Sequence, residues 1–247
     1  MLRSVCLGLI VVFALTPNFS HGQNKVYLGL QYGHSWFTYN YKDYGSGFIN
    51  KSRANNKFTI GAKLKYVRPN EKLFYETGIG YCEFQQYYSL RNYLSAWEER
   101  YPVITVPFRA GLNLYKPNSK MQFSIAGGVS LNFLPEQYQG EYSVVFFKSS
   151  SPRIIDSITR GNIIRDFGGF FPLLNLSAAG SYKIGNKLKA EASFEISKGF
   201  YKITEYEAFY NDGSGLNDQR ANQWGKGDNY SLRFALLYDL SRKSEKK

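Results

Sequence analysis

Apolar and polar residues alternate along residues 57–67. Phe58 and Ile60 fall on one face of this segment, and Lys63 and Lys65 fall on the other. Successive side chains of a β-strand point to opposite sides of the sheet, so an alternation of period two is typical of a strand. Residues 57–67 are therefore predicted to form a strand with one apolar and one polar face.

The same alternation recurs in further segments, which lie at residues 25–37, 73–85, 103–115, 121–134, 171–183, 187–199 and 229–240. A tilted strand needs roughly 9 to 11 residues to cross the hydrocarbon of a membrane, whereas soluble proteins typically use strands of about 5 or 6. Residues 73–85 match least well, because Phe74 falls on their polar face. The length of the alternating segments predicts membrane-spanning strands.

Short and long connections alternate between these segments. The short ones, residues 68–72, 116–120 and 183–187, are rich in Pro, Asn, Gly and Lys, as tight turns require. The intervening segments are predicted to be long loops, at residues 38–56, 86–102, 135–169 and 200–228. Short periplasmic turns and long external loops characterise bacterial outer-membrane barrels. The predicted fold is all-β, a closed antiparallel up-and-down transmembrane β-barrel of eight strands.

One part of the longest predicted loop leaves an alternative open. Residues 142–148 are apolar and β-prone, and residues 153–165 mix Ile with Arg. They form either a hairpin above the membrane or two further spanning strands, which would make a barrel of ten strands. The hairpin is favoured because residues 142–148 are short for a membrane span and do not alternate.

Aromatic residues lie near both ends of the apolar faces. Those near the short turns are Tyr66, Tyr75, Tyr182 and Tyr238, and those near the long loops are Trp36, Tyr81, Phe133 and Tyr230. Membrane barrels carry bands of aromatic residues, called girdles, at both membrane–water interfaces. The aromatic content of 17% is consistent with that arrangement.

The first residues indicate export. Arg3 is followed by an apolar run over residues 4–16, and Ser20, His21 and Gly22 offer a small-x-small cleavage site. The apolar run is well short of the roughly 20 residues of a membrane-spanning helix. We therefore expect a signal peptide at residues 1–22, a barrel domain at residues 23–240 and a short basic tail at residues 241–247.

The net charge indicates which partners the chain would bind, and the cysteine content indicates whether a disulfide can stabilise it. Removing residues 1–22 takes away one Arg and no acid, so the formal charge falls from +12 to +11. In an outer-membrane protein this balance favours lipid phosphates and lipopolysaccharide, and it does not indicate nucleic acid. Cys82 is then the remaining cysteine, so no disulfide forms within the chain.

If the apolar faces meet lipid, the polar faces line the lumen and bring charges of both signs inside. The predicted lumen charge network contains Lys63, Lys65, Glu76, Arg109, Glu191, Glu195 and Arg233, and Lys189 and Asp239 share its face. Lys63 and Glu76 are expected at similar heights on paired strands, and Glu191, Glu195 and Arg233 likewise. The network is either an ion path or a set of salt bridges in a packed core, and the narrow interior of an eight-stranded barrel favours the second.

No catalytic, metal or cofactor site is predicted. His34 is the one histidine beyond the expected signal peptide, and it lies on the lipid-facing phase while Ser35 points the other way. Residues 211–218 contain Asp, Asn and Gly without the spacing of a calcium loop. We therefore expect a protein that is not an enzyme, with no cofactor and no bound metal.

Three segments resemble the PorT-like family of eight-stranded outer-membrane barrels. They are Tyr-Pro-Val-Ile-Thr-Val-Pro-Phe-Arg at residues 101–109, Gly127-Gly128, and residues 188–200. The resemblance covers nearly the whole chain after residue 22, and its motifs build the barrel. It implies an outer-membrane location, and the family includes a component linked to protein secretion. The family's final strand often ends the chain with an aromatic residue, whereas here Tyr238 is followed by residues 239–247.

The expected function is a structural or protein-binding role in the cell envelope, as an accessory of protein secretion. The alternatives are a lipid-modifying or proteolytic barrel enzyme, for which His34 is the candidate residue, and a barrel that binds small solutes. Outer-membrane lipid, lipopolysaccharide and an envelope or secretion protein are the expected partners. Aromatic and basic loop residues either form a recognition surface, as Tyr, Trp and Arg often do, or brace the barrel rim and touch lipopolysaccharide, and the second interpretation is slightly favoured. They include Tyr87, Tyr88, Trp97, Tyr138, Arg153, Tyr210 and Trp224.

Overall fold

The computed structural model describes residues 24–44, 49–50, 55–69, 72–90, 96–114, 119–134, 139–147, 154–162, 169–210 and 219–241. The expected signal peptide and nearly all of the basic tail lie outside these residues. Eight strands form a closed barrel, namely β1 (Lys25–Asp43), β3 (Asn55–Val67), β4 (Leu73–Leu90), β5 (Ala96–Asn113), β6 (Met121–Phe133), β9 (Phe170–Lys183), β10 (Leu188–Gly199) and β12 (Gln219–Asp239).

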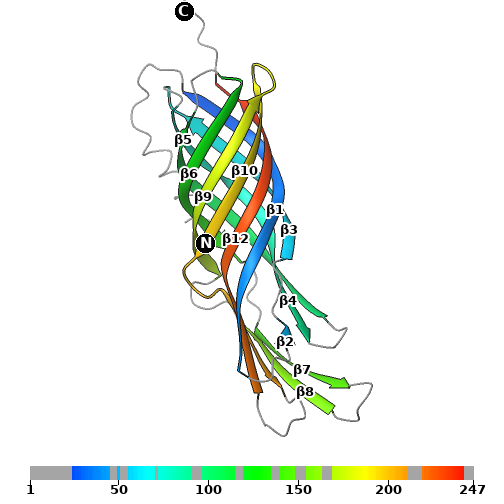
Figure 1. Ribbon diagram of the computed structural model, residues 1–247. Helices are drawn as coiled ribbons and strands as arrows, with labels where there is room; N and C mark the ends of the chain where they lie inside the picture. Colours follow the sequence, from blue (N-terminus) through cyan, green and yellow to red (C-terminus); the bar gives the residue numbers. More distant parts are fainter. Residues whose placement is uncertain are drawn as a thin grey trace, which may run out of the picture.

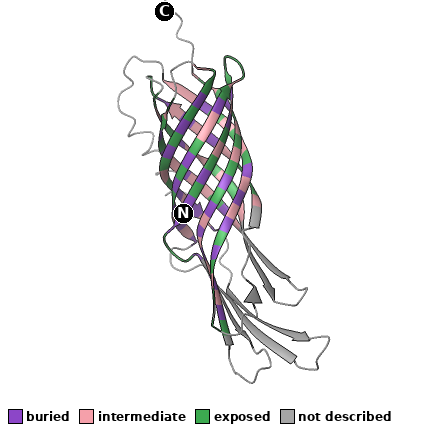
Figure 2. Cartoon of the chain, in the orientation of Figure 1, coloured by how far each residue is buried: buried purple, intermediate pink, exposed green. Residues whose placement is uncertain are grey.

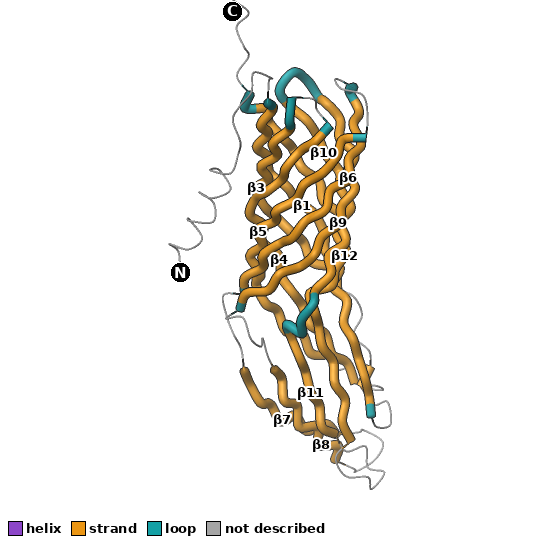
Figure 3. Tube along the Cα trace, turned by 90° about the vertical axis from the view of Figure 1, so that its left-hand side faces the viewer, coloured by secondary structure: helices purple, strands orange, loops and turns teal. Residues whose placement is uncertain are grey.

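All the strand pairings of the barrel are antiparallel, and the first and last strands close it. β1 pairs with β3 on one side and with β12 on the other, in a register that sets Leu28 opposite Tyr238 and Trp36 opposite Tyr230. Figures 1 and 3 show the strands tilted around a common axis, as closure of a barrel requires. The predicted closed barrel of eight strands is confirmed.

The two faces of the barrel strands follow the predicted alternation. Along β6, every second residue from Gln122 to Asn132 is buried apart from Gly128, which is half-buried, and residues between them such as Phe123 and Ile125 are exposed. Figure 2 shows the same alternation of buried and exposed residues around the barrel. The buried face contains most of the charge, and the exposed face is apolar. A soluble protein has its apolar residues inside and its polar residues outside. The reverse arrangement here matches a barrel wall surrounded by hydrocarbon.

The prediction of long loops is wrong for many of these residues, because the structure places them in strands. β1, β4, β5 and β12 continue beyond the barrel, and the additional strands are β2 (Ile49–Asn50), β7 (Gln139–Phe147), β8 (Ile154–Asn162) and β11 (Thr204–Tyr210). β12, β11, β8 and β7 pair in that order and form a sheet that projects from one end of the barrel (Figure 1). A strand outside the membrane needs no lipid-facing apolar side, so the long alternation that predicts a membrane span does not identify it.

The pairing of β7 and β8 distinguishes between a barrel of eight strands and one of ten. They pair with each other, and β8 pairs with β11 outside the barrel, while β6 pairs directly with β9. The wall thus closes without β7 and β8. The expected hairpin is confirmed, and the ten-stranded alternative is excluded.

A bulge marks the place where β1 and β12 leave the barrel. Phe37 pairs with Asn229 and Tyr39 pairs with Gly225, so residues 226–228 lie opposite Thr38 alone. Gly227 has a φ of 78°, a conformation that side chains with a Cβ rarely adopt. The Asp228 carboxylate accepts a hydrogen bond of 2.7 Å from the backbone nitrogen of Gly199 on β10 and pairs with Lys198. Bulges bend strands, and this one directs the pair away from the barrel.

A closed lumen with a buried charge network

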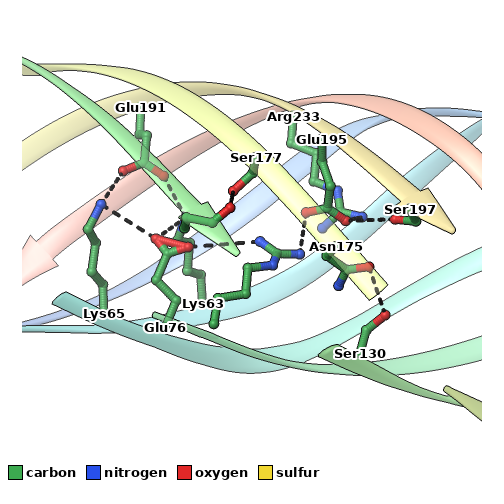
Figure 4. A network of polar contacts seen from close by, with 12 residues as sticks. Lys63, Lys65, Glu76, Ser130, Asn175, Ser177, Glu191, Glu195, Ser197 and Arg233 are labelled. Carbon is green, nitrogen blue, oxygen red and sulfur yellow. Dashed lines mark hydrogen bonds and ion pairs between the residues drawn. The ribbon is translucent and has the colours of Figure 1, made fainter. Parts of the chain in front are cut away.

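Glu76 and Glu191 contact two lysines, Lys63 and Lys65, inside the lumen (Figure 4). Lys63 Nζ is 2.8 Å from a carboxylate oxygen of Glu76 and 2.5 Å from one of Glu191. Lys65 Nζ is 3.4 Å from Glu76 and 3.0 Å from Glu191. The side chains of Lys65 and Glu191 are each 1% exposed. These four residues from β3, β4 and β10 form a compact ion cluster shielded from water.

Arg109 connects this cluster to a third carboxylate. Its Nη1 lies 3.8 Å from Glu76, and its Nη2 pairs with Glu195 on β10. Glu195 also pairs with Arg233 on β12 at 3.1 Å and accepts a hydrogen bond of 3.3 Å from the Ser197 hydroxyl. The guanidinium groups therefore share one carboxylate, and the predicted network residues form one continuous set of contacts.

The structure brings together all seven predicted lumen charges, but with different partners for Glu191. Glu195 and Arg233 lie together as expected, whereas Glu191 pairs across the lumen with Lys63 and Lys65. Glu191 and Glu195 are four residues apart, which is about 13 Å along a strand. The two carboxylates thus belong to different levels of the barrel. Contacts across the lumen depend on barrel tilt, which strand phase alone does not specify.

A neutral polar layer adjoins the charges. The Thr105 hydroxyl is 2.7 Å from Asn132 Oδ1, and Asn132 Nδ2 donates to the carbonyl oxygens of Ser130 and Phe171 at 3.2 and 3.3 Å. The Ser130 hydroxyl lies 3.4 Å from Asn175 Oδ1. These side chains were missed as functional candidates, although their positions on the buried phase of β5, β6 and β9 could have identified them.

Apolar clusters occupy both ends of the lumen. The cluster near the short turns contains Tyr27, Val67, Phe74, Ala126 and Leu237. The cluster near the projecting sheet contains Phe37, Tyr39, Val103, Leu134, Phe171, Leu173 and Ile203, with Cys82 packed against it. Cys82 is a free thiol. The charge network is thus enclosed by apolar side chains at both ends of the lumen.

Two lysines connect the charges to the short-turn cluster. Lys65 Nζ lies 4.0 Å from the centre of the Phe74 ring. Lys189 Nζ lies 2.6 Å from Gln122 Oε1 and 5.4 Å from the centre of the Tyr27 ring. Phe74, which weakened the strand pattern, therefore supplies an aromatic face to a buried ammonium group.

The predicted girdle residues all lie on the outward face. At the short-turn end, Tyr66 and Tyr75 are paired neighbours with ring centres 6.3 Å apart, while Tyr182 and Tyr238 are exposed. At the other end, Trp36 stacks on Tyr230 at 5.4 Å, Phe133 packs on Phe170, and Tyr81 is exposed. These side chains extend from the two rims of the wall.

His34 belongs to this outer surface. Its Nε2 is 3.1 Å from the Tyr32 hydroxyl, and its ring lies beside Trp36. Ser35, the adjacent hydroxyl, faces the lumen and is 2% exposed. The geometry therefore does not build a nucleophile and base from this pair. Among the described residues, no group of three or more His, Cys, Asp or Glu side chains is placed to hold a metal.

The aromatic and basic residues singled out in the predicted loops lie on the projecting strands where they are described. Tyr87 and Tyr88 are on β4, Trp97 is on β5, Tyr210 is on β11, and Trp224 is on β12. Tyr138 and Arg153 lie outside the described residues. The described part of the chain contains no helix with the length and apolar character needed to cross a membrane.

No protein-family model and no curated protein matches the chain. Among solved structures, the chain is similar to the outer membrane protein OprG from Pseudomonas aeruginosa, with 10% identity over 90% of this chain and 99% of that one and a TM-score of 0.52. The N-terminal β-barrel domain of Pseudomonas aeruginosa OprF matches with 10% identity over 89% and 100% of the two chains and a TM-score of 0.42. Neisserial surface protein A matches with 12% identity over 84% and 95% and a TM-score of 0.36. The likeness to OprG and the strand order together establish an all-β fold, the closed eight-stranded antiparallel barrel of outer-membrane proteins.

Proposed function

We propose that this chain is an integral outer-membrane protein that neither conducts ions nor catalyses a reaction, and that its projecting sheet holds a protein partner. Two features together support this proposal: side chains fill the lumen, and a sheet extends well beyond the barrel. A barrel without a water path is suited to anchoring. The projecting strands then supply the functional surface.

The outer wall supports the membrane location. Large apolar side chains such as Leu30, at 74% exposure, and Leu176, at 63%, cover the barrel strands. Exposed apolar surface of this extent is costly in water, because each square ångström contributes about 25 cal/mol. Hydrocarbon removes that cost. Short turns at one end and long projections at the other are the arrangement of barrels whose short turns face the periplasm.

The layered lumen supports the absence of conduction. An ion entering from either end meets an apolar cluster before it reaches the charge network. Inside, the carboxylates of Glu76, Glu191 and Glu195 are already engaged by lysine and arginine side chains. A permeating ion would have to displace these pairs without hydration. The salt bridges therefore serve to neutralise a packed core.

The edge of the projecting sheet supports protein binding. β7 is the last strand of the order β12, β11, β8, β7, and its described pairing is with β8. A strand at a sheet edge offers backbone donors and acceptors to an added strand, a mode that many recognition proteins use. An extended segment of an envelope protein is the partner that this edge fits best.

The resemblance to PorT-like barrels supports a secretion role for that partner. Residues 101–109 and Gly127-Gly128 lie in β5 and β6, so the resembling motifs belong to the wall. The same anchor would present different sheets in different proteins. We therefore propose an accessory of protein secretion, with specificity in the strands outside the membrane.

The test is purification of the full chain from outer membranes in mild detergent, compared with a variant in which residues 139–162 are replaced by a short Gly-Ser linker. A partner at near-equal stoichiometry is expected with the full chain and not with the variant. Both proteins should fold, because β6 and β9 pair without the hairpin. Equal recovery of the partner with both proteins, or recovery of a lone barrel, would contradict the proposal.

A further inference from the structure

A groove of about 710 Å³ crosses the outer wall of the barrel. It begins at the short-turn end, beside Met121 at the start of β6 and Tyr182 near the end of β9. From there it passes over β10 and β12 and ends beside Tyr32 and Ile60, nearer the middle of β1 and β3. Its course is therefore oblique, from the rim toward the middle of the apolar wall.

Small residues form the floor of this groove. In the strand register, Ala192 lies between Gly180 and Phe234, and Ala190 lies between Tyr182 and Leu236. All six line the groove. Gly180, Ala190 and Ala192 are the small members of this lining, and Tyr182, Phe234 and Leu236 are larger members on the flanking strands. The depression is a consequence of side-chain size on the outward phase of β9 and β10.

Three lysines lie in the turns beside the short-turn end of the groove, next to residues of its lining. Lys120 precedes Met121, Lys183 follows Tyr182, and Lys187 closes the turn that leads into β10. The backbone nitrogen of Lys183 donates to the carbonyl oxygen of Lys120 at 2.9 Å, so these two connections are adjacent. Lys187 Nζ lies 5.5 Å from the centre of the Tyr238 ring at the same rim. Residues 119–123 and 180–190 contain no acidic side chain. Glu191 of the groove lining faces the lumen, where it pairs with Lys63 and Lys65, and Asp239, whose backbone nitrogen donates to the Lys187 carbonyl oxygen at 2.8 Å, lies at the same rim.

We propose that the groove and its three lysines bind one anionic phospholipid of the periplasmic leaflet. The phosphate lies among Lys120, Lys183 and Lys187, and an acyl chain follows the floor toward the middle of the wall. Basic sites beside apolar membrane surfaces recognise anionic headgroups through the same charge complementarity. The inference rests on the proposed membrane location and assigns a lipid class to one surface of it.

The pairing of the surrounding strands favours an acyl chain as the occupant. β10 is paired with β9 on one side and β12 on the other, so the floor offers no free backbone to an added strand. The walls are apolar and the groove is open along its length. A flexible hydrocarbon chain fits such a depression, and the lysines explain the preference for a negative headgroup.

The test uses native mass spectrometry of the full chain in detergent, titrated with phosphatidylglycerol or with phosphatidylcholine of the same acyl chains. One retained phosphatidylglycerol per barrel is expected, with weaker retention of phosphatidylcholine. Each Lys→Gln change at 120, 183 or 187 is expected to weaken phosphatidylglycerol binding by about fivefold. Ala192→Leu should abolish retention by filling the floor, without changing any charge.

Matched controls lie elsewhere on the same wall. Arg68→Gln removes a rim charge from a different turn, and Ala110→Leu enlarges an outward residue of β5 outside the groove. Neither should change retention. Equal binding of the two lipids, or equal loss in the control variants, would overturn the proposal. A folded barrel that binds phosphatidylglycerol but co-purifies with no protein would refute only the role of the projecting sheet.

Discussion

Phenylalanine side chains occur on both the inner and the outer face of the barrel wall, under different physical conditions. Phe74 and Phe123 illustrate the contrast, since Phe74 is 1% exposed in the lumen and Phe123 is 44% exposed on the outer surface. The lumen is packed like a protein interior, where each missing atom leaves a void. The outer surface meets fluid hydrocarbon, which fills voids readily. The same substitution should therefore have unequal costs on the two faces.

The largest expected effect is in the charge network. Glu191→Gln leaves Lys63 and Lys65 with Glu76 as their remaining carboxylate, and breaking a buried ion pair costs about 3 to 5 kcal/mol. The free energy of unfolding, measured by urea titration in detergent micelles, should fall by that amount. The double variant Lys65→Met/Glu191→Leu should recover most of it, because both charges are then absent. A single variant as stable as the wild type would show that the network is hydrated.

A cavity in the short-turn cluster should be nearly as costly. Phe74→Ala removes a ring from the lumen and a cation–π contact with Lys65, with an expected loss of about 3 to 5 kcal/mol. Phe123→Ala should cost less, about 1.5 to 3 kcal/mol, because fluid hydrocarbon fills the space of the lost ring and only the transfer of the ring between hydrocarbon and water is lost. Urea titrations of the two variants compare them directly. Equal losses would indicate that the assignment of faces is incorrect.

The adjacent glycines of β6 provide a smaller contrast. A Cβ at Gly128 would lie 2.0 Å from the carbonyl oxygen of Phe108, whereas one at Gly127 would meet nothing closer than 3.7 Å. Gly128→Ala is therefore expected to destabilise the barrel by about 1 to 3 kcal/mol through overpacking. Gly127→Ala should be neutral within about 0.5 kcal/mol. Thermal unfolding of both variants in the same detergent distinguishes the two positions.

The smallest effect is expected at His34. Its contacts are with Tyr32 and Trp36 on the outer surface, so His34→Ala should leave the lumen intact and alter stability by no more than about 1 kcal/mol. Because we propose no catalytic role, the pattern of lipid A modification in cells should also remain unchanged. Loss of a modified lipid A species in the variant would restore the enzyme alternative.

Strand phase was enough to predict most of the barrel. The alternation around Phe58 and Lys63 assigned inner and outer faces correctly, because hydrocarbon outside and packing inside impose opposite preferences on neighbouring residues. The same alternation predicted which charges lie in the lumen. It did not predict that residues 219–228 form a strand, because they belong to the projecting part of β12, where no hydrocarbon selects an apolar face.

Contacts across the barrel were harder to predict. Glu191 reaches Lys63 and Lys65 on a strand that is not its neighbour, and this depends on tilt and on the heights of long side chains. The groove over Ala190 and Ala192 likewise depends on the register between strands. Neither follows from the pattern within a single strand. A register is fixed by the whole closed sheet.

Planar-bilayer recording of the purified full chain tests the central claim, a closed lumen, most directly. The apolar clusters at both ends and the paired charges between them predict a silent bilayer, with no stable conductance steps when folded protein is inserted. Insertion can be verified independently by protection of the barrel from protease. Reproducible conductance steps from verified, folded wild-type barrels would contradict the account and return the charge network to the role of an ion path.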